Sequence, residues 1–108
     1  MKVYLVRERK NINAVGEYDM ETKALTVKKG SRVSEGIAYT EKFRGAKTIE
    51  KDRAGTVKDH IVTKDISFKS ASTAANFVTG GSTNGLMAWK ADNGLTIKEV
   101  IANGVTEK

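Results

Sequence analysis

Short runs of alternating apolar and polar residues mark the first third of the chain as β-structure. Residues 2–7 read K-V-Y-L-V-R, residues 12–18 form a second apolar-rich run, and residues 24–28 read A-L-T-V-K. Runs of this length that are rich in β-branched and aromatic residues favour strands. Gly16 lies inside the second run and predicts a bend or bulge there. With the polar turn at residues 19–22, the three runs predict an antiparallel meander.

Helical spacing replaces alternation in three later segments. Apolar residues recur every three to four positions through residues 39–53, which predicts an amphipathic helix. A second helix is predicted over residues 70–79, because Ser70 is placed to cap its first turn and Gly80 suits the left-handed residue that ends a helix. A short terminal helix is expected to begin near Thr96.

Three further short segments complete the pattern. Residues 56–63 and residues 66–68 carry small apolar patches that predict short strands or an extended connection. Asn84-Gly85 predicts a tight turn, because both residue types accept positive φ. The run L-M-A-W at residues 86–89 is then predicted to be the strand that follows this turn.

Length and composition favour one small globular domain. A chain of 108 residues, 39% hydrophobic and 30% charged, lies outside the disordered range and suffices for one modest core. We therefore expect residues 1–108 to form a single α+β domain with a small, mostly antiparallel sheet and two or three helices packed on it. Residues 103–108 are expected to be a frayed tail.

Cysteine usage and hydropathy narrow the chemistry. The absence of cysteine excludes disulfides and thiolate-held metal sites. No apolar run is long enough for a signal peptide or a membrane span, so we expect a cytoplasmic protein with no membrane partner.

The charge balance favours a polyanionic partner. Lys and Arg number 19 against 13 Asp and Glu, which gives a net charge of +6 and an isoelectric point near 9.6. A positive field of this kind promotes association with nucleic acid. The alternative is that the charge serves only solubility.

A basic cluster at residues 28–32 reads Lys28-Lys29-Gly30-Ser31-Arg32. Gly30 lets the backbone turn and Ser31 adds a hydroxyl donor, a combination that resembles a phosphate-contacting loop. The spacing of a Walker loop is absent. The alternative interpretation is a solvated turn at the end of a strand.

The start of the 70–79 helix is a second candidate anion site. Free N–H groups and the helix dipole converge at such a terminus, where Ser70 and Ser72 lie beside Lys69. The alternative is that both serines only cap the helix. Asn84 has a similar pair of interpretations, since it suits a turn but its amide also matches an adenine edge.

Candidate catalytic chemistry is sparse. His60 is the only histidine, no serine has a recognisable histidine partner, and no nucleophile elbow is present. We therefore expect a noncatalytic protein without a cofactor or a metal ion. The single tryptophan, Trp89, is expected to anchor the core, and if exposed it would be a stacking platform for a base.

Residues 68–90 resemble a bacterial domain family of unknown function. The family pattern is F-x-S-x-S-x-A-A-x-x-V-x-G-x-S-x-N-G-x-x-x-W-K, and the matching positions are Phe68, Ser70, Ser72, Ala74, Ala75, Val78, Gly80, Ser82, Asn84, Gly85, Trp89 and Lys90. Residues 25–34 resemble the family's K-G-S block and residues 94–99 its closing segment. The resemblance spans residues 17–101.

The resemblance implies a role beside nucleic acid. Family members commonly form the C-terminal part of larger proteins, some with a GIY-YIG-type nuclease domain. A similar block occurs in the restriction-enzyme and adenine-methylase associated domain, which has been proposed to recognise DNA. The chain departs from the pattern at Ala71, where relatives often have proline, and at Gly81, where they often have a basic residue.

These observations predict a noncatalytic accessory domain that binds nucleic acid, with DNA as the expected ligand. The predicted contacts are Lys28, Lys29, Ser31, Arg32, Lys69, Ser70, Ser72, Asn84 and Lys90. The alternative is a protein-interaction module that docks a partner enzyme through an exposed sheet edge at residues 2–7.

Overall fold

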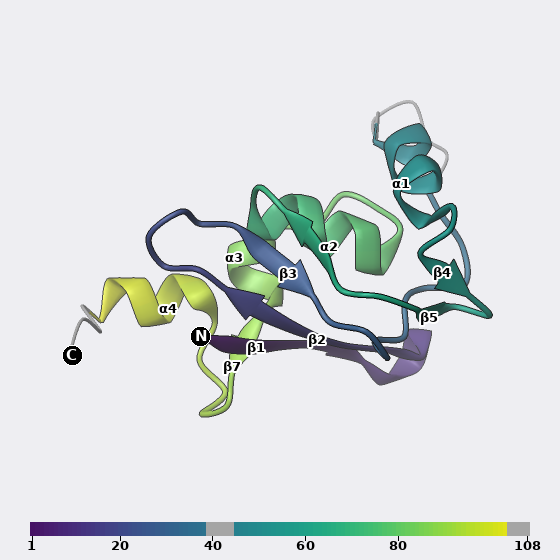
Figure 1. Cartoon of the computed structure of the whole chain (residues 1–108). Helices are drawn as coiled ribbons and strands as arrows, with labels where there is room; N and C mark the ends of the chain where they lie inside the picture. Colours follow the sequence, from purple (N-terminus) through teal and green to yellow (C-terminus); the bar gives the residue numbers. More distant parts are fainter. Residues whose placement is uncertain (39–44, 104–108) are drawn as a thin grey trace.

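An antiparallel sheet with helices on one face forms the protein (Figure 1). The computed structural model describes residues 1–38 and 45–103. The five-stranded sheet has the order β6-β3-β2-β1-β7, and every neighbouring pair is antiparallel. The predicted α+β class is confirmed. The elements are β1 (Lys2–Arg7), η1 (Glu8–Lys10), β2 (Ile12–Tyr18), β3 (Leu25–Val27), α1 (Ala46–Arg53), β4 (Val57–Lys58), β5 (Ile61–Val62), β6 (Ile66–Phe68), α2 (Ala71–Thr79), α3 (Gly85–Ala88), β7 (Lys90–Ala91) and α4 (Ile97–Ala102).

The N-terminal meander is confirmed, but the bulge predicted at Gly16 is wrong. The β1–β2 ladder runs without interruption from Lys2 opposite Glu17 to Arg7 opposite Ile12. Gly16 is required by packing instead, because a Cβ there would lie 2.8 Å from Leu25 Cδ2. The glycine thus lets neighbouring side chains close over the strand.

The sheet has different edges from the one predicted. β1 pairs with β2 on one side and with β7 on the other, so the segment Lys2–Arg7 is an interior strand. The expected edge at residues 2–7 is covered by β7 at Val3 and Tyr4, whereas the ladder between β1 and β7 does not extend over residues 5–7. The edges of the five-stranded sheet are β6 and β7.

Helix α2 supplies most of the contacts that close the core. Ser70 caps it as predicted, its hydroxyl accepting a hydrogen bond from the Thr73 N–H at 3.1 Å. Gly80 ends it in the left-handed conformation at φ 79°. The buried residues of α2 are Ala71, Ala74, Ala75, Phe77 and Val78. Small alanines let the helix axis approach the sheet closely.

The segment predicted as a strand at residues 86–89 is helical, and this prediction is wrong. Asn84 has a φ of −79° and caps α3 by accepting the Leu86 N–H at 3.1 Å. Asn84-Gly85 is therefore a helix start, whereas the sequence predicted a turn with positive φ. Trp89 follows the helix and is fully buried, which confirms its predicted place in the core.

The remaining helices agree with the sequence pattern where the structure describes them. α1 begins at Ala46, inside the predicted range 39–53, and residues 39–44 of that prediction lie outside the described residues. α4 begins after Thr96, where Thr96 and Glu99 form a capping box. Of the predicted tail, only Asn103 belongs to the described part of the chain.

Candidate nucleic-acid interface

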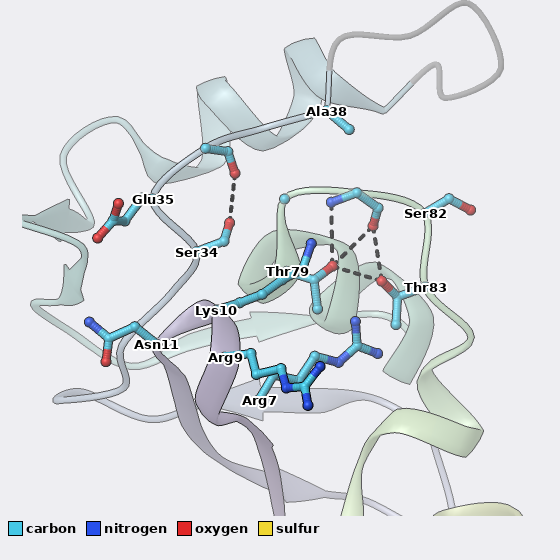
Figure 2. A pocket seen from close by; sticks show the side chains of 13 residues that line it. Arg7, Arg9, Lys10, Asn11, Ser34, Glu35, Ala38, Thr79, Ser82 and Thr83 are labelled. Carbon is cyan, nitrogen blue, oxygen red and sulfur yellow. Dashed lines mark hydrogen bonds between the residues drawn. The ribbon is translucent and has the colours of Figure 1, made fainter.

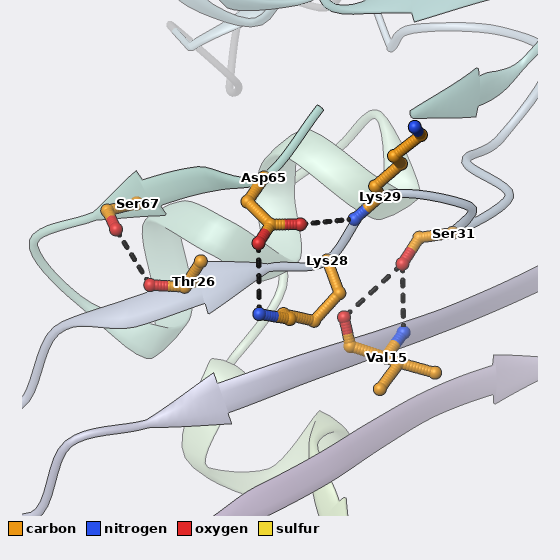
Figure 3. A network of polar contacts seen from close by, with 7 residues as sticks. All are labelled: Val15, Thr26, Lys28, Lys29, Ser31, Asp65 and Ser67. Atoms are coloured by element: carbon orange, nitrogen blue, oxygen red, sulfur yellow. Dashed lines mark hydrogen bonds and ion pairs between the residues drawn. The ribbon is translucent and has the colours of Figure 1, made fainter. Parts of the chain in front are cut away.

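The predicted basic cluster is partly neutralised by an acid that is distant in sequence (Figure 3). Lys28 Nζ forms an ion pair with Asp65 Oδ2 at 2.9 Å, and the Lys29 N–H donates to Asp65 Oδ1 at 2.8 Å. The Lys29 N–H and then the Lys28 ammonium lower the pKa of the Asp65 carboxyl below its ordinary value. Lys28 is therefore engaged before any ligand arrives.

Ser31 serves the fold. Its side chain is buried, and its hydroxyl oxygen accepts the Val15 N–H at 3.0 Å. The same hydroxyl lies 3.3 Å from the Val15 carbonyl oxygen, to which it donates. The next residue, Arg32, pairs through its backbone with Asn13 of β2. Its side chain is half-exposed.

The start of α2 is covered by the chain itself. The Ser72 hydroxyl accepts the Gly85 N–H at 3.0 Å, so α3 is fastened onto the first turn of α2. Gly85 has so little room that a Cβ would overlap the Ala71 carbonyl and the Ser72 amide nitrogen. This packing places α3 directly against the first turn of α2. Lys69, just before the cap, is exposed.

The nine predicted residues do not form one surface. Lys90 lies on β7 opposite Tyr4, on the sheet face that α2 does not cover. Lys28 projects from the same open face. Lys69 follows the strand end that pairs with Leu25, at the other end of β3 from Lys28. Most of the hydroxyl and amide groups are used in capping or bridging.

A different set of basic residues converges on a hollow of about 570 Å³ (Figure 2). We call it the cationic hollow. Arg7, Arg9 and Lys10 line one side, and segments 34–36 and 79–83 line the other. Figure 2 shows the three basic side chains extending from one turn toward the rim at Thr79 and Thr83.

A tight turn explains why these cations point the same way. β1 ends at Arg7, and the 3-10 turn η1 follows at once. Asn11 closes the turn in the left-handed conformation at φ 56°, and its N–H donates to the Glu8 carbonyl at 3.0 Å. Asparagine tolerates this conformation better than most residues do. The turn therefore presents Arg9 and Lys10 beside Arg7.

The opposite rim is held by internal hydrogen bonds. The hydroxyls of Thr79 and Thr83 are 2.7 Å apart and hydrogen-bonded. The Thr83 N–H donates to Asn76 Oδ1 on α2 at 2.8 Å. These contacts fix the segment after α2, so the rim is formed before a ligand binds.

Arg53 of α1 holds the segment at residues 34–36 that lines the cationic hollow. Its guanidinium donates to the Ser34 carbonyl at 3.1 Å and to the Phe77 carbonyl at 2.7 Å. It also donates to the Ser34 hydroxyl at 3.0 Å. One side chain thus joins α1, the segment at residues 34–36 and the last turn of α2.

Arg53→Lys is expected to lower the free energy of unfolding by about 2 kcal/mol, because an ammonium cannot reproduce the planar fork and loses charge-assisted hydrogen bonds. Urea unfolding followed by Trp89 fluorescence measures the loss. Lys51→Ala on the exposed side of the same helix is the control and is expected to change little. Equal stability of the two variants would contradict the role of Arg53.

The basic side chains of the cationic hollow are not engaged in ion pairs with described residues. Within residues 1–38 and 45–103, the side chains of Arg7, Arg9 and Lys10 form no ion pair or hydrogen bond. Glu35 is the one acidic residue in the lining, and it forms no ion pair within those ranges either. The Ser82 N–H is also without a hydrogen bond to any described residue, and its side chain is exposed. The three basic side chains and the Ser82 N–H are hydrogen-bond donors suited to an anion.

Sequence reasoning missed this hollow. The signal was present as R-E-R-K at residues 7–10, three basic residues in four positions. The pattern places only Arg7 at the end of a predicted strand, and the rim at residues 79–83 begins about 70 positions later in the sequence. In the described part of the chain, no three His, Asp or Glu side chains gather to hold a metal ion. His60 lies in the β4–β5 turn at φ 67°.

Fold and site together define a small α+β domain with a preformed cationic hollow beside its sheet. The family model for a domain of unknown function, DUF4357, matches residues 5–101, so the chain belongs to this family. Neither a curated protein nor a solved structure is found to match the chain. Among the described helices, none has the length and apolar character to cross a membrane.

Proposed function

We propose that this domain binds nucleic acid without catalysing a reaction, and that the cationic hollow holds the phosphate backbone. The observation that carries the proposal is the convergence of Arg7, Arg9 and Lys10 without acidic partners among the described residues. The resemblance of residues 68–90 to domains associated with DNA enzymes favours DNA as the ligand. The net charge of +6 agrees with a polyanionic partner.

The chemistry of the hollow fits a phosphodiester. Arginine presents a planar fork that matches two phosphate oxygens, and lysine adds a point charge. The Ser82 N–H on the opposite rim, which no described residue accepts, supplies a neutral donor. Phosphate contacts release counterions, so a rise in salt concentration weakens binding. With about three such contacts, raising the salt from 50 to 200 mM is expected to weaken binding roughly 20- to 40-fold.

Reversing the charge of the hollow is expected to abolish binding. The test variant carries Arg7→Glu, Arg9→Glu and Lys10→Glu, and fluorescence anisotropy measures its affinity for labelled single-stranded and duplex DNA and RNA at two salt concentrations. All three side chains are exposed, so the variant is expected to fold. Circular dichroism checks this.

A matched control separates local contacts from net charge. The variant Lys28→Glu, Lys29→Glu and Arg32→Glu replaces the same number of positive charges in the basic cluster at residues 28–32. We expect it to retain most of the affinity, because Lys28 is already paired with Asp65.

Two results would overturn the proposal. Loss of binding only in the control variant would move the interface to the basic cluster at residues 28–32. No binding by the unaltered protein even at low salt would remove nucleic acid as the ligand. Salt-insensitive capture of one protein partner would then favour the docking alternative.

A further inference from the structure

We infer that a base-binding subsite adjoins the cationic hollow, so that the domain selects unpaired nucleotides over duplex. This inference rests on the proposed function and specifies its ligand. A second hollow of about 270 Å³ shares Arg7, Ser82 and Thr83 with the first and extends to Asn84 and Met87. The two hollows therefore adjoin at these three shared residues.

The second hollow is mostly polar, and Met87 is the large apolar side chain in its lining that suits the face of a base. Met87 projects from α3 with 49% of its surface exposed, although it is a large apolar side chain. Its thioether is polarizable and packs well against aromatic rings. Arg7 lines both hollows, and a guanidinium group can stack on a base and pair with a phosphate.

Asn84 adds a polar group at the edge of this subsite. Its Oδ1 accepts the Leu86 N–H, which fixes the amide and leaves the NH₂ group directed away from that bond. An amide in this state donates to a base carbonyl or ring nitrogen. The subsite therefore offers an apolar contact to the base face and a donor to its edge.

The subsite is rigid although α3 has only four residues. Gly85 is fastened to Ser72, and Trp89 Nε1–H donates to the Ala71 carbonyl at 3.1 Å, so both ends of α3 are anchored on α2. Thr83 is held to Asn76. Ligand binding at this position therefore costs little conformational entropy of the protein.

This arrangement discriminates against duplex nucleic acid. In a duplex each base face is stacked and its pairing edge is occupied, so a duplex offers no free base face to Met87. A single strand offers the phosphate to Arg9 and Lys10 and a free base to Met87. Stacking of one base on such a platform is worth about 1–3 kcal/mol.

The test compares three probes at one salt concentration. They are an oligothymidylate of about ten nucleotides, a strand of equal length with abasic residues in place of thymidines, and a duplex of equal length. All carry a phosphate backbone, but only the first has unpaired bases. We expect the oligothymidylate to bind at least about fivefold more tightly than either of the other two.

Met87→Ala supplies the residue-level test. It is expected to weaken oligothymidylate binding about fivefold and to leave binding of the abasic strand unchanged. Met20→Ala is the matched control, because Met20 is also exposed but lies in the turn after β2. It is expected to change neither affinity.

The outcomes distinguish this inference from the function on which it rests. Equal binding of the thymidylate and abasic strands, unaffected by Met87→Ala, would overturn the base subsite. The cationic hollow would still stand if Arg7→Glu, Arg9→Glu and Lys10→Glu together abolished binding of both strands. Binding that survives this charge reversal would overturn the proposed function itself.

Discussion

Gly85→Ala is expected to lower the free energy of unfolding by about 4 kcal/mol, an unusually large effect for one added methyl group. The new Cβ would overlap the carbonyl group of Ala71 and the amide nitrogen of Ser72. These are backbone atoms of α2, so no rotamer change relieves the overlap. The first turn of α3 would have to lift away from α2 and break the Gly85–Ser72 hydrogen bond.

Thermal unfolding followed by circular dichroism measures this loss, and the midpoint is expected to fall by roughly 15 °C or more. Gly36→Ala is the control, since a Cβ there has nothing within 4 Å and the residue does not have positive φ. That variant is expected to be neutral or slightly stabilised. Similar midpoints for the two variants would show that α3 does not pack tightly on α2.

Trp89→Ala is expected to cost about 4 kcal/mol of unfolding free energy, because it empties a fully buried site and removes a hydrogen bond. The indole packs beside Gly16 of β2, where a Cβ would lie 3.3 Å from Trp89 Cζ3. It therefore joins the sheet to α2 and to the end of α3.

Urea unfolding followed by circular dichroism checks this prediction, since the variant lacks the only tryptophan. Met87→Ala, two residues earlier and exposed, is expected to leave stability nearly unchanged. A small loss of stability in Trp89→Ala would contradict the role of Trp89 in joining the sheet to α2 and α3. A large effect at Met87 would show that its side chain supports the fold.

Local patterning was sufficient to predict the strands of the meander and the limits of α2. In β1 and β2 the buried positions alternate with exposed ones, as the period of a half-buried strand requires. Ser70 and Gly80 mark the ends of α2 by their own backbone preferences. These signals depend on residues close together in sequence, so no tertiary contact was needed.

The prediction for residues 84–89 was wrong because the conformation of this segment depends on contacts with residues distant in sequence. A run of four apolar residues is too short to separate a strand from a helix by periodicity. Asn-Gly is as suitable for a helix start packed against another backbone as for a hairpin turn. The partner that decides between them is Ala71, which lies 14 positions before Gly85.

The candidate site was harder to predict for a related reason. The density of positive charge along the sequence does not show which of the two basic clusters, residues 28–32 or residues 7–10, has an acidic partner. Asp65, 37 positions after Lys28, engages one cluster, whereas the other has no acidic partner among the described residues. Only the fold shows which cations are already paired.

The anchoring of α3 on α2 has a consequence for how binding preference could change. The contacts among Ser72, Gly85 and Trp89 hold the frame, while Arg9 and Lys10 project from a three-residue turn that contributes no buried residue. Substitutions in that turn therefore alter the ligand-facing charge at little cost to folding. The turn is a natural position for diversification, by evolution or by a combinatorial library, on a scaffold that stays the same.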